Sequence, residues 1–204
     1  MITTAWEAAG LTQSHWLKHS LDIRLRLAAQ PYMDGGWSYS LSSPKILWAP
    51  PAGMRIDKLV YGAGSKVTNC STLTCSLITS VRPDVGWTVE DYGDLQVYAD
   101  RLPDRPDSPI QAVVQQGIAE RVDGPVARRW CLVQGVRELT VENGALASFS
   151  GHAFMVRRDG TTLTVIEATS RKDADGLPIG PRYRQTTRED LVQEYKYALY
   201  WALL

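Results

Sequence analysis

The sequence predicts an α+β fold, because apolar residues recur at helical spacing in its first part and follow strand patterns in its second. Apolar residues make up 44% and charged residues 22% of the 204-residue chain, values typical of an ordered globular protein. This length suffices for one domain with a full core. We expect a single domain over 1–204, with a helix and a wrapping loop in 1–55 and the core in 56–204.

The first 55 residues combine one predicted helix with a loop rich in aromatic residues. Apolar residues recur at helical spacing from Gln13 to Ala29, which predicts an amphipathic helix. Residues 31–51 are rich in Gly, Ser and Pro but also hold Trp37, Tyr39 and Trp48. Flexible linkers rarely carry such large side chains, so we expect an ordered loop.

The middle of the chain predicts further helices. An apolar stripe from Asn69 to Val81 follows a capping residue, either Thr68 or Asn69, and stops before Pro83. Two more helices, separated by prolines, are expected near 88–120. We interpret these two helices as an insertion into the core.

After Gly124-Pro125 the pattern changes to strands, with apolar runs enriched in β-branched residues. The expected strands cover 129–136, 151–158, 161–169 and 196–204. Asp159-Gly160 is typical of a two-residue hairpin turn. A polar loop over Arg171–Pro181 and a short helix from Thr187 are expected before the last strand.

Charge and hydropathy argue against several classes of protein. The 22 basic residues balance the 22 acidic ones, so the chain lacks the net positive charge of a nucleic-acid binder. It has no apolar run of about 18 residues, the minimum for a membrane-spanning helix. The first residues lack the basic start and apolar core of a secretory signal. We expect a protein that is cytoplasmic as synthesised, with neither nucleic acid nor membrane as a partner.

Three cysteines are too few and too irregularly spaced for a disulfide framework or a zinc site. Cys70 lies in the first turn of its predicted helix, where free N–H groups favour a thiolate and can stabilise an oxyanion. Cys75 and Cys131 lie in apolar surroundings and are expected to be buried and inert. Cys70 is therefore the candidate nucleophile, with simple burial as the alternative. His15 and His19 lack a third ligand, so no metal or other cofactor is expected.

A thiolate nucleophile needs a base, and His152 lies where a strand can present it. With a two-residue turn at Asp159-Gly160, His152 directly faces Glu167 on the next strand. A carboxylate at that place would orient the imidazole, as the third member of a triad does. An ion pair that only stabilises the hairpin is the alternative, but it leaves Cys70 unexplained.

Three blocks around these residues follow a known pattern. Tyr61-Gly62-Ala63-Gly64 with Asn69-Cys70-Ser71-Thr72-Leu73 resembles the tyrosine–glycine approach and the Asp-Cys-Ser-Gly-Leu block of the NlpC/P60 superfamily, which are papain-like cysteine hydrolases. Gly151-His152-Ala153-Phe154-Met155-Val156 resembles the Gly-His-Val-Gly-Ile block of that superfamily. Val165-Ile166-Glu167-Ala168 resembles the strand that carries its third polar residue.

This resemblance implies a papain-like fold, in which the nucleophile helix packs on an antiparallel sheet. It implies a cysteine peptidase or amidase without a cofactor, with peptidoglycan stem peptides as the substrate. Cys70, His152 and Glu167 would form the catalytic triad, and Tyr61 and Ser71 would lie at the oxyanion or substrate site. A substrate in the cell wall would require delivery by a phage or a secretion system.

Two other hypotheses stay open. The same residues could act on a cytosolic substrate, as a thiol protease, a deamidase or an acyltransferase. The chain could instead be a non-catalytic scaffold that binds a partner through the aromatic loop from Gly36 to Trp48. A separate hypothesis is a groove for a sugar or a peptide lined by Trp37, Trp48 and Trp87, although aromatic residues are more often part of a core. The intact set of cysteine, histidine and glutamate argues against the scaffold.

Overall fold

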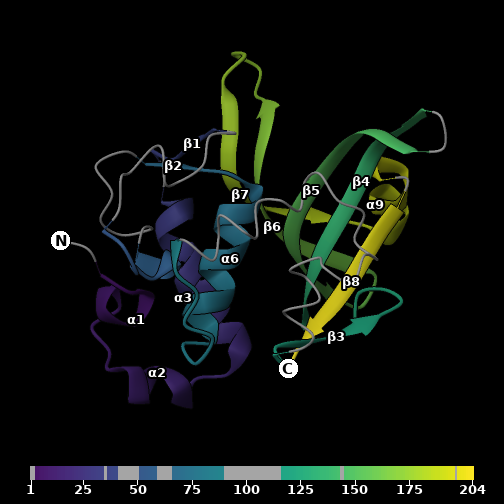
Figure 1. The fold of residues 1–204 in the computed structure, drawn as a ribbon. Helices are drawn as coiled ribbons and strands as arrows, with labels where there is room; N and C mark the ends of the chain where they lie inside the picture. Colours follow the sequence, from purple (N-terminus) through teal and green to yellow (C-terminus); the bar gives the residue numbers. More distant parts are fainter. Residues whose placement is uncertain are drawn as a thin grey trace. The chain divides into compact units, whose positions relative to one another are not determined.

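The computed structural model describes residues 3–34, 36–40, 51–58, 66–89, 116–142, 145–195 and 197–204. Its contacts gather in two compact units: a helical unit, Met1–Gly93 with Glu167–Arg182, and a sheet unit, Asp94–Ile166 with Tyr183–Leu204. Helices precede an antiparallel sheet along the chain, which confirms the α+β prediction (Figure 1). No helix in the described ranges is long and apolar enough to cross a membrane.

Within residues 3–34, the helical unit has three short helices where the sequence predicts one. They are α1 (Ala5–Ala8), α2 (Gln13–Lys18) and α3 (Leu21–Met33). Each begins at a hydroxyl side chain, from Thr4, Thr12 or Ser20, that accepts a hydrogen bond from a backbone N–H of the first turn. The single-helix prediction is wrong because His19 is extended and Ser20 starts a new helix, although the apolar spacing continues across the break.

Helix α6 (Cys70–Val81) ends where predicted and starts one residue after the predicted Asn69, which is its N-cap. The side-chain oxygen of Asn69 accepts hydrogen bonds from the backbone N–H and the hydroxyl of Thr72, both at 2.8 Å. Helix α3 packs beside α6 within the same unit (Figure 1). The unit also holds the 3₁₀ helix η1 (Ile56–Lys58) and a parallel pair of short strands, β1 (Ser38–Tyr39) and β2 (Val67–Thr68).

Two side chains from the start of the chain bind the C-terminal end of α6. The indole N–H of Trp16 donates to the carbonyl oxygen of Ser80 at 2.8 Å, and the guanidinium of Arg24 donates to that of Val81. The last carbonyls of a helix have no partner within the helix, and they carry partial negative charge. The N-terminal helices therefore complete the hydrogen bonding of α6.

Arg55 adds a third contact to this end of α6. Its guanidinium donates to the carbonyl oxygens of Thr79 and Pro83, at 3.3 and 2.9 Å. It also forms two hydrogen bonds with Asp57, whose side chain is fully buried, and lies 5.6 Å from the ring centre of Trp6. A buried carboxylate is costly without such a partner, so Arg55 satisfies Asp57 and the helix end together.

The described strands of the main sheet lie in the order β3-β8-β4-β5-β6-β7 (Figure 1). They are β3 (Ala119–Val122), β4 (Trp130–Glu142), β5 (Ala145–Asp159), β6 (Thr162–Lys172), β7 (Pro178–Thr186) and β8 (Tyr197–Leu203). Helix α9 (Arg188–Glu194), capped by Thr187, connects β7 to β8. The predicted short helix and the predicted last strand are thus confirmed. Strands β6 and β7 continue from the sheet unit into the helical unit.

The polar loop predicted over Arg171–Pro181 is wrong. Strand β6 runs to Lys172, and β7 starts at Pro178, so most of this stretch is a hairpin. Two prolines flank Gly180, which has a φ of 72°, and such residues are rare inside strands. The composition therefore concealed the strand. The helices predicted near 88–120 fall mainly on residues 90–115, outside the described residues.

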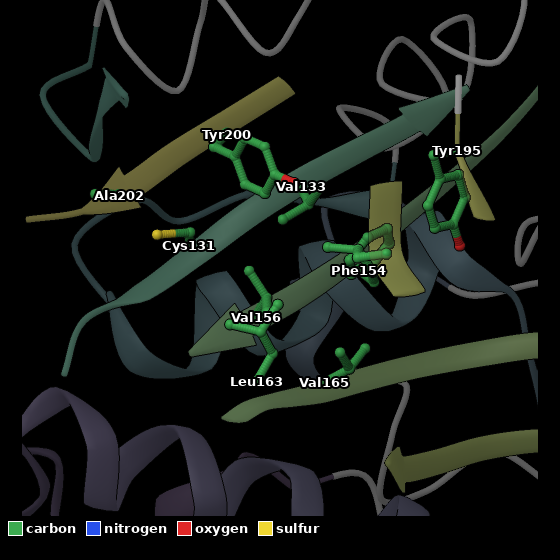
Figure 2. Close-up of a cluster of buried hydrophobic side chains, with 10 residues drawn as sticks. Cys131, Val133, Phe154, Val156, Leu163, Val165, Tyr195, Tyr200 and Ala202 are labelled. Carbon is green, nitrogen blue, oxygen red and sulfur yellow. The ribbon is translucent and has the colours of Figure 1, made fainter. Parts of the chain in front are cut away.

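An apolar cluster covers one face of the sheet (Figure 2). Its buried members are Cys131, Val133, Phe154, Val156, Leu163, Val165, Leu191, Tyr195, Tyr200 and Ala202. On the strands these positions alternate, as the two-residue period of a strand requires. Met155 and Ile166, which point to the opposite face, are buried as well. Burial of both faces explains why these strands read as continuous apolar runs.

Candidate active site

Cys70 is the first residue of α6, and its side chain is partly exposed. The positive end of the helix dipole and the N–H groups of the first turn favour a negative charge at this position. Ser71 follows it, with its hydroxyl oxygen 3.8 Å from the sulfur. The predicted nucleophile therefore lies at a helix N-terminus with part of its surface accessible, as the proposed chemistry requires.

Tyr39 brings a phenol to the same sulfur. Its hydroxyl lies 3.8 Å from the Sγ of Cys70 and is oriented to donate to it. Strand β1 pairs with β2 so that Tyr39 lies beside Thr68, two residues before the nucleophile. The resemblance implied Tyr61 for such a role, but Tyr61 lies outside the described residues. Tyr39 was missed because it reaches the site through the pairing of two very short strands that lie far apart in the sequence. Such a pairing leaves no pattern in the sequence.

The other two cysteines are buried, as predicted. Burial raises the pKa of the Cys75 thiol to about 12. Burial also raises the pKa of Cys131, which belongs to the apolar cluster of the sheet. Nucleophilic attack requires the thiolate, so both side chains are poor nucleophiles at neutral pH.

His152 lies on β5, directly opposite Gly135 of β4, and only 5% of its surface is exposed. Its ring stacks with two aromatic side chains of the same unit. The centre of the Phe154 ring is 5.5 Å away, and that of Tyr195 is 6.4 Å away, with interplanar angles of 29° and 5°. The predicted base is therefore a buried histidine within an aromatic stack.

The hairpin between β5 and β6 turns one residue later than predicted. Asp159 pairs with Thr162, so Gly160, with a φ of 65°, and Thr161 form the turn. Facing positions are thereby displaced by two residues, and the prediction that His152 directly faces Glu167 is wrong in register. A two-residue displacement does not change which face of the sheet a side chain occupies.

Glu167 of β6 is almost fully buried and has an arginine partner. The Nε and Nη2 atoms of Arg182 both donate to its Oε1, at 2.9 and 2.7 Å. Because β7 folds back along β6, residues 15 apart in sequence meet. Arg182 was missed because no strand was predicted there: the loop expected over Arg171–Pro181 took in the start of β7, and Arg182 follows it directly. The guanidinium compensates a carboxylate charge that would be costly to bury alone.

Strand β7 also approaches the segment that carries Tyr39. A Cβ atom added to Gly180 would lie 2.8 Å from the carbonyl oxygen of Trp37. Gly180 lies two residues before Arg182, and Trp37 lies two residues before Tyr39. Within the helical unit, these contacts link the Glu167–Arg182 pair to the strand beside the nucleophile.

The remaining candidates are the other histidines and the three tryptophans. His15 is exposed, and in the described part of the chain no three His, Cys, Asp or Glu side chains form a group that could hold a metal ion. Trp87 is buried, in agreement with a place in the core, whereas Trp37 is partly exposed. Trp48, the third residue of the hypothetical groove, lies outside the described residues.

Comparison of the chain with protein-family models, curated proteins and solved structures finds no match. The chemistry of the site therefore rests on its own residues. Cys70 is an accessible thiol with two hydroxyl neighbours. A histidine and a carboxylate are the side-chain types that serve such a thiol as base and orienting group.

Proposed function

We propose that the protein is a papain-like cysteine hydrolase of the NlpC/P60 type, which cleaves an amide bond in peptidoglycan stem peptides. The observation that carries the proposal is the contrast among the three thiols. Cys70 is partly exposed at a helix N-terminus, with Tyr39 and Ser71 hydroxyls at 3.8 Å, whereas the other two are buried. A cysteine kept only for packing needs neither exposure nor polar neighbours.

In the proposed mechanism the thiolate of Cys70 attacks the carbonyl carbon of the substrate. His152 holds the thiol proton and transfers it to the departing amine, so that the C–N bond breaks and a thioester remains. Water then attacks the thioester, His152 accepts a proton from that water, and the proton returns to sulfur as the acid leaves. Each proton that the histidine takes is released within the cycle.

The oxyanion of each tetrahedral intermediate needs hydrogen-bond donors. We assign this role to the N-terminal N–H groups of α6 and to the hydroxyl of Tyr39, which already lies beside the sulfur. Glu167 is the proposed orienting carboxylate for His152. Arg182 keeps this buried carboxylate paired and fixed through two hydrogen bonds to one oxygen.

The proposal is tested by incubating the wild type and Cys70→Ala with purified peptidoglycan and with a thiol-reactive probe. Cys75→Ala is the matched control, because it removes a buried thiol from the same helix. We expect wall digestion and probe labelling for the wild type and for the control, and neither for Cys70→Ala. Labelling without digestion would favour a cytosolic substrate, and absence of Cys70 labelling would favour a binding scaffold.

A second experiment tests whether the base and the nucleophile work together. 1,3-Dibromoacetone joins a thiol and an imidazole that lie within a few ångströms, and each group displaces one bromide. We expect peptide mapping to find Cys70 linked to His152. Linkage to His15, or only singly alkylated Cys70, would contradict the proposed pairing.

A further inference from the structure

Three aromatic rings of the sheet unit lie against one another, and His152 is one of them. Tyr195, directly after α9, is nearly parallel to the imidazole, with an interplanar angle of 5° and ring centres 6.4 Å apart. The Phe154 ring stacks with both, at 5.5 Å from the histidine and 5.4 Å from the tyrosine. Figure 2 shows the Phe154 and Tyr195 side chains of this group. The imidazole therefore has an aromatic surface beside it that comes from outside its own strand.

Gly135 creates the space for the tyrosine ring. It lies directly opposite His152 on β4, and a Cβ atom there would be 2.4 Å from Cδ1 of Tyr195. A real Cβ cannot come that close, so any other residue would displace the ring. The Tyr195 ring can therefore lie beside His152 only because the residue paired with His152 is a glycine.

A charged network holds the other end of the tyrosine. Arg137, next to an irregularity of β4, donates to the Tyr195 hydroxyl at 3.0 Å and lies 5.0 Å from its ring centre. The same guanidinium pairs with Glu194 at 2.9 Å. The second oxygen of Glu194 pairs with Arg184 of β7 at 2.8 Å. The phenol is thus fixed at its hydroxyl as well as along its ring.

We propose that Tyr195 is a positioning residue for the base. The effect of Tyr195 on catalysis rests on the proposed function, but its restriction of the His152 ring does not. A ring packed against the imidazole opposes rotation about χ2 of His152, and so limits the directions in which its two nitrogens point. A histidine free to rotate would present the wrong nitrogen to the nucleophile for part of the time.

The test compares Tyr195→Leu, Tyr195→Phe and Gly135→Ala with Tyr200→Leu. Tyr200 is a buried tyrosine of the same cluster without a ring contact to the histidine, so its substitution controls for lost packing. Two readouts are needed: kcat and KM of the hydrolase, and NMR of the His152 ring. The chain has only three histidines, which makes the ring signals assignable.

We expect Tyr195→Leu and Gly135→Ala to lower kcat at least about tenfold, with KM within about twofold, because small displacements of a catalytic group are costly. The His152 ring signals should broaden or show a mixture of tautomers in both variants. Tyr195→Phe, which keeps the ring, should stay within about threefold of the wild type, and Tyr200→Leu should leave the ring signals unchanged.

Equal effects of Tyr195→Leu and Tyr200→Leu on both readouts would overturn the inference. A Tyr195→Phe protein as impaired as Tyr195→Leu would overturn it too, because the hydroxyl and not the ring would then be responsible. If Tyr195→Leu does not fold, Gly135→Ala takes its place as the variant that displaces the ring. It is then compared with Tyr195→Phe and Tyr200→Leu on the same two readouts. A wild type without hydrolase activity would contradict the proposed function, while the NMR comparison would still decide the positioning role.

Discussion

The two ends of α6 are built in opposite ways. At the C-terminal end, long side chains of Trp16, Arg24 and Arg55 bind the last carbonyls, and Arg55 also pairs with a buried aspartate. At the N-terminal end, the cap residue Asn69 is buried but Cys70 keeps part of its surface exposed. One end of the helix is fixed by packing, and the other end carries the proposed nucleophile.

This difference suggests how a thiol can be both accessible and well placed. A nucleophile that is itself buried would be held firmly but would be desolvated, as the pKa of about 12 for Cys75 illustrates. Fixing the far end of the helix positions Cys70 without covering it. Arginine charges at the C-terminal end and a thiolate at the N-terminal end also both match the helix dipole.

The largest expected contrast is between the thiols of this one helix. At pH 8, a thiol with a pKa of about 12 is a thiolate in only about one molecule in 10⁴. Iodoacetamide should therefore label Cys70 at least about 10³ times faster than Cys75, measured by mass spectrometry of peptides. Because the pKa of Cys75 is raised, its labelling should increase as pH rises. Native-state labelling of Cys75 or Cys131 ahead of Cys70 would break the comparison.

The same substitution at two positions separates chemistry from packing. Cys70→Ser should lower kcat/KM at least about 10³-fold, as loss of a nucleophile does, with almost no change in Tm, because the site is a partly exposed helix start. Cys75→Ser should keep activity but cost about 1–3 kcal/mol of stability, because it buries a hydroxyl in the core. A large drop in Tm for Cys70→Ser would identify Cys70 as a packing residue.

The fixed end of α6 is tested by Arg55→Leu. The change leaves the buried Asp57 without its guanidinium and two carbonyl oxygens without their donor. Removing one partner of a buried pair costs about 3–5 kcal/mol, which urea unfolding measures. Peptide-mapped alkylation in the same variant should show faster labelling of Cys75, because the unfolded state is more populated. A loss of less than about 1 kcal/mol in the free energy of unfolding would show that the Arg55 contacts do not fix the C-terminal end of α6.

Much of the fold follows from local patterns. Helix α6 was predicted to within one residue because a capping residue precedes it and Pro83 follows it, and the strands around His152 have long apolar runs. Strand β7 was not predicted, since proline and glycine interrupt it. The break between α2 and α3 was not predicted either, because the apolar spacing continues through Ser20.

The candidate site also contains residues that local patterns indicate and residues that only long-range pairing brings together. Cys70 and His152 were proposed as site residues from where they lie on their own elements, and this stays a prediction. Tyr39 and Arg182 were not, because a parallel pairing and a hairpin bring them to their partners. The turn was misplaced by one residue because a glycine fits either central position of a two-residue turn, and so Gly160 alone does not fix the register.

The smallest effect is expected at Asp84, just beyond α6. The Arg82–Asp84 pair has the same spacing as Arg55–Asp57, but the aspartate side chain is 61% exposed. Hydrogen bonds from Arg82 lower the pKa of Asp84. A carboxyl group whose pKa is lower in the folded state stabilises the fold above its unfolded pKa, and this contribution is lost as pH falls through the folded value.

Asp84→Asn should therefore destabilise the protein by at most about 0.5 kcal/mol at neutral pH, because water and salt screen an exposed pair. The difference from the wild type should shrink in acid and with added salt. Urea unfolding of both proteins at pH 7 and pH 3, at low and high ionic strength, measures it. A loss at pH 7 as large as that of Arg55→Leu would show that burial is not what separates the two pairs. The C-terminal end of α6 would then depend on its charges rather than on the contacts that cover them.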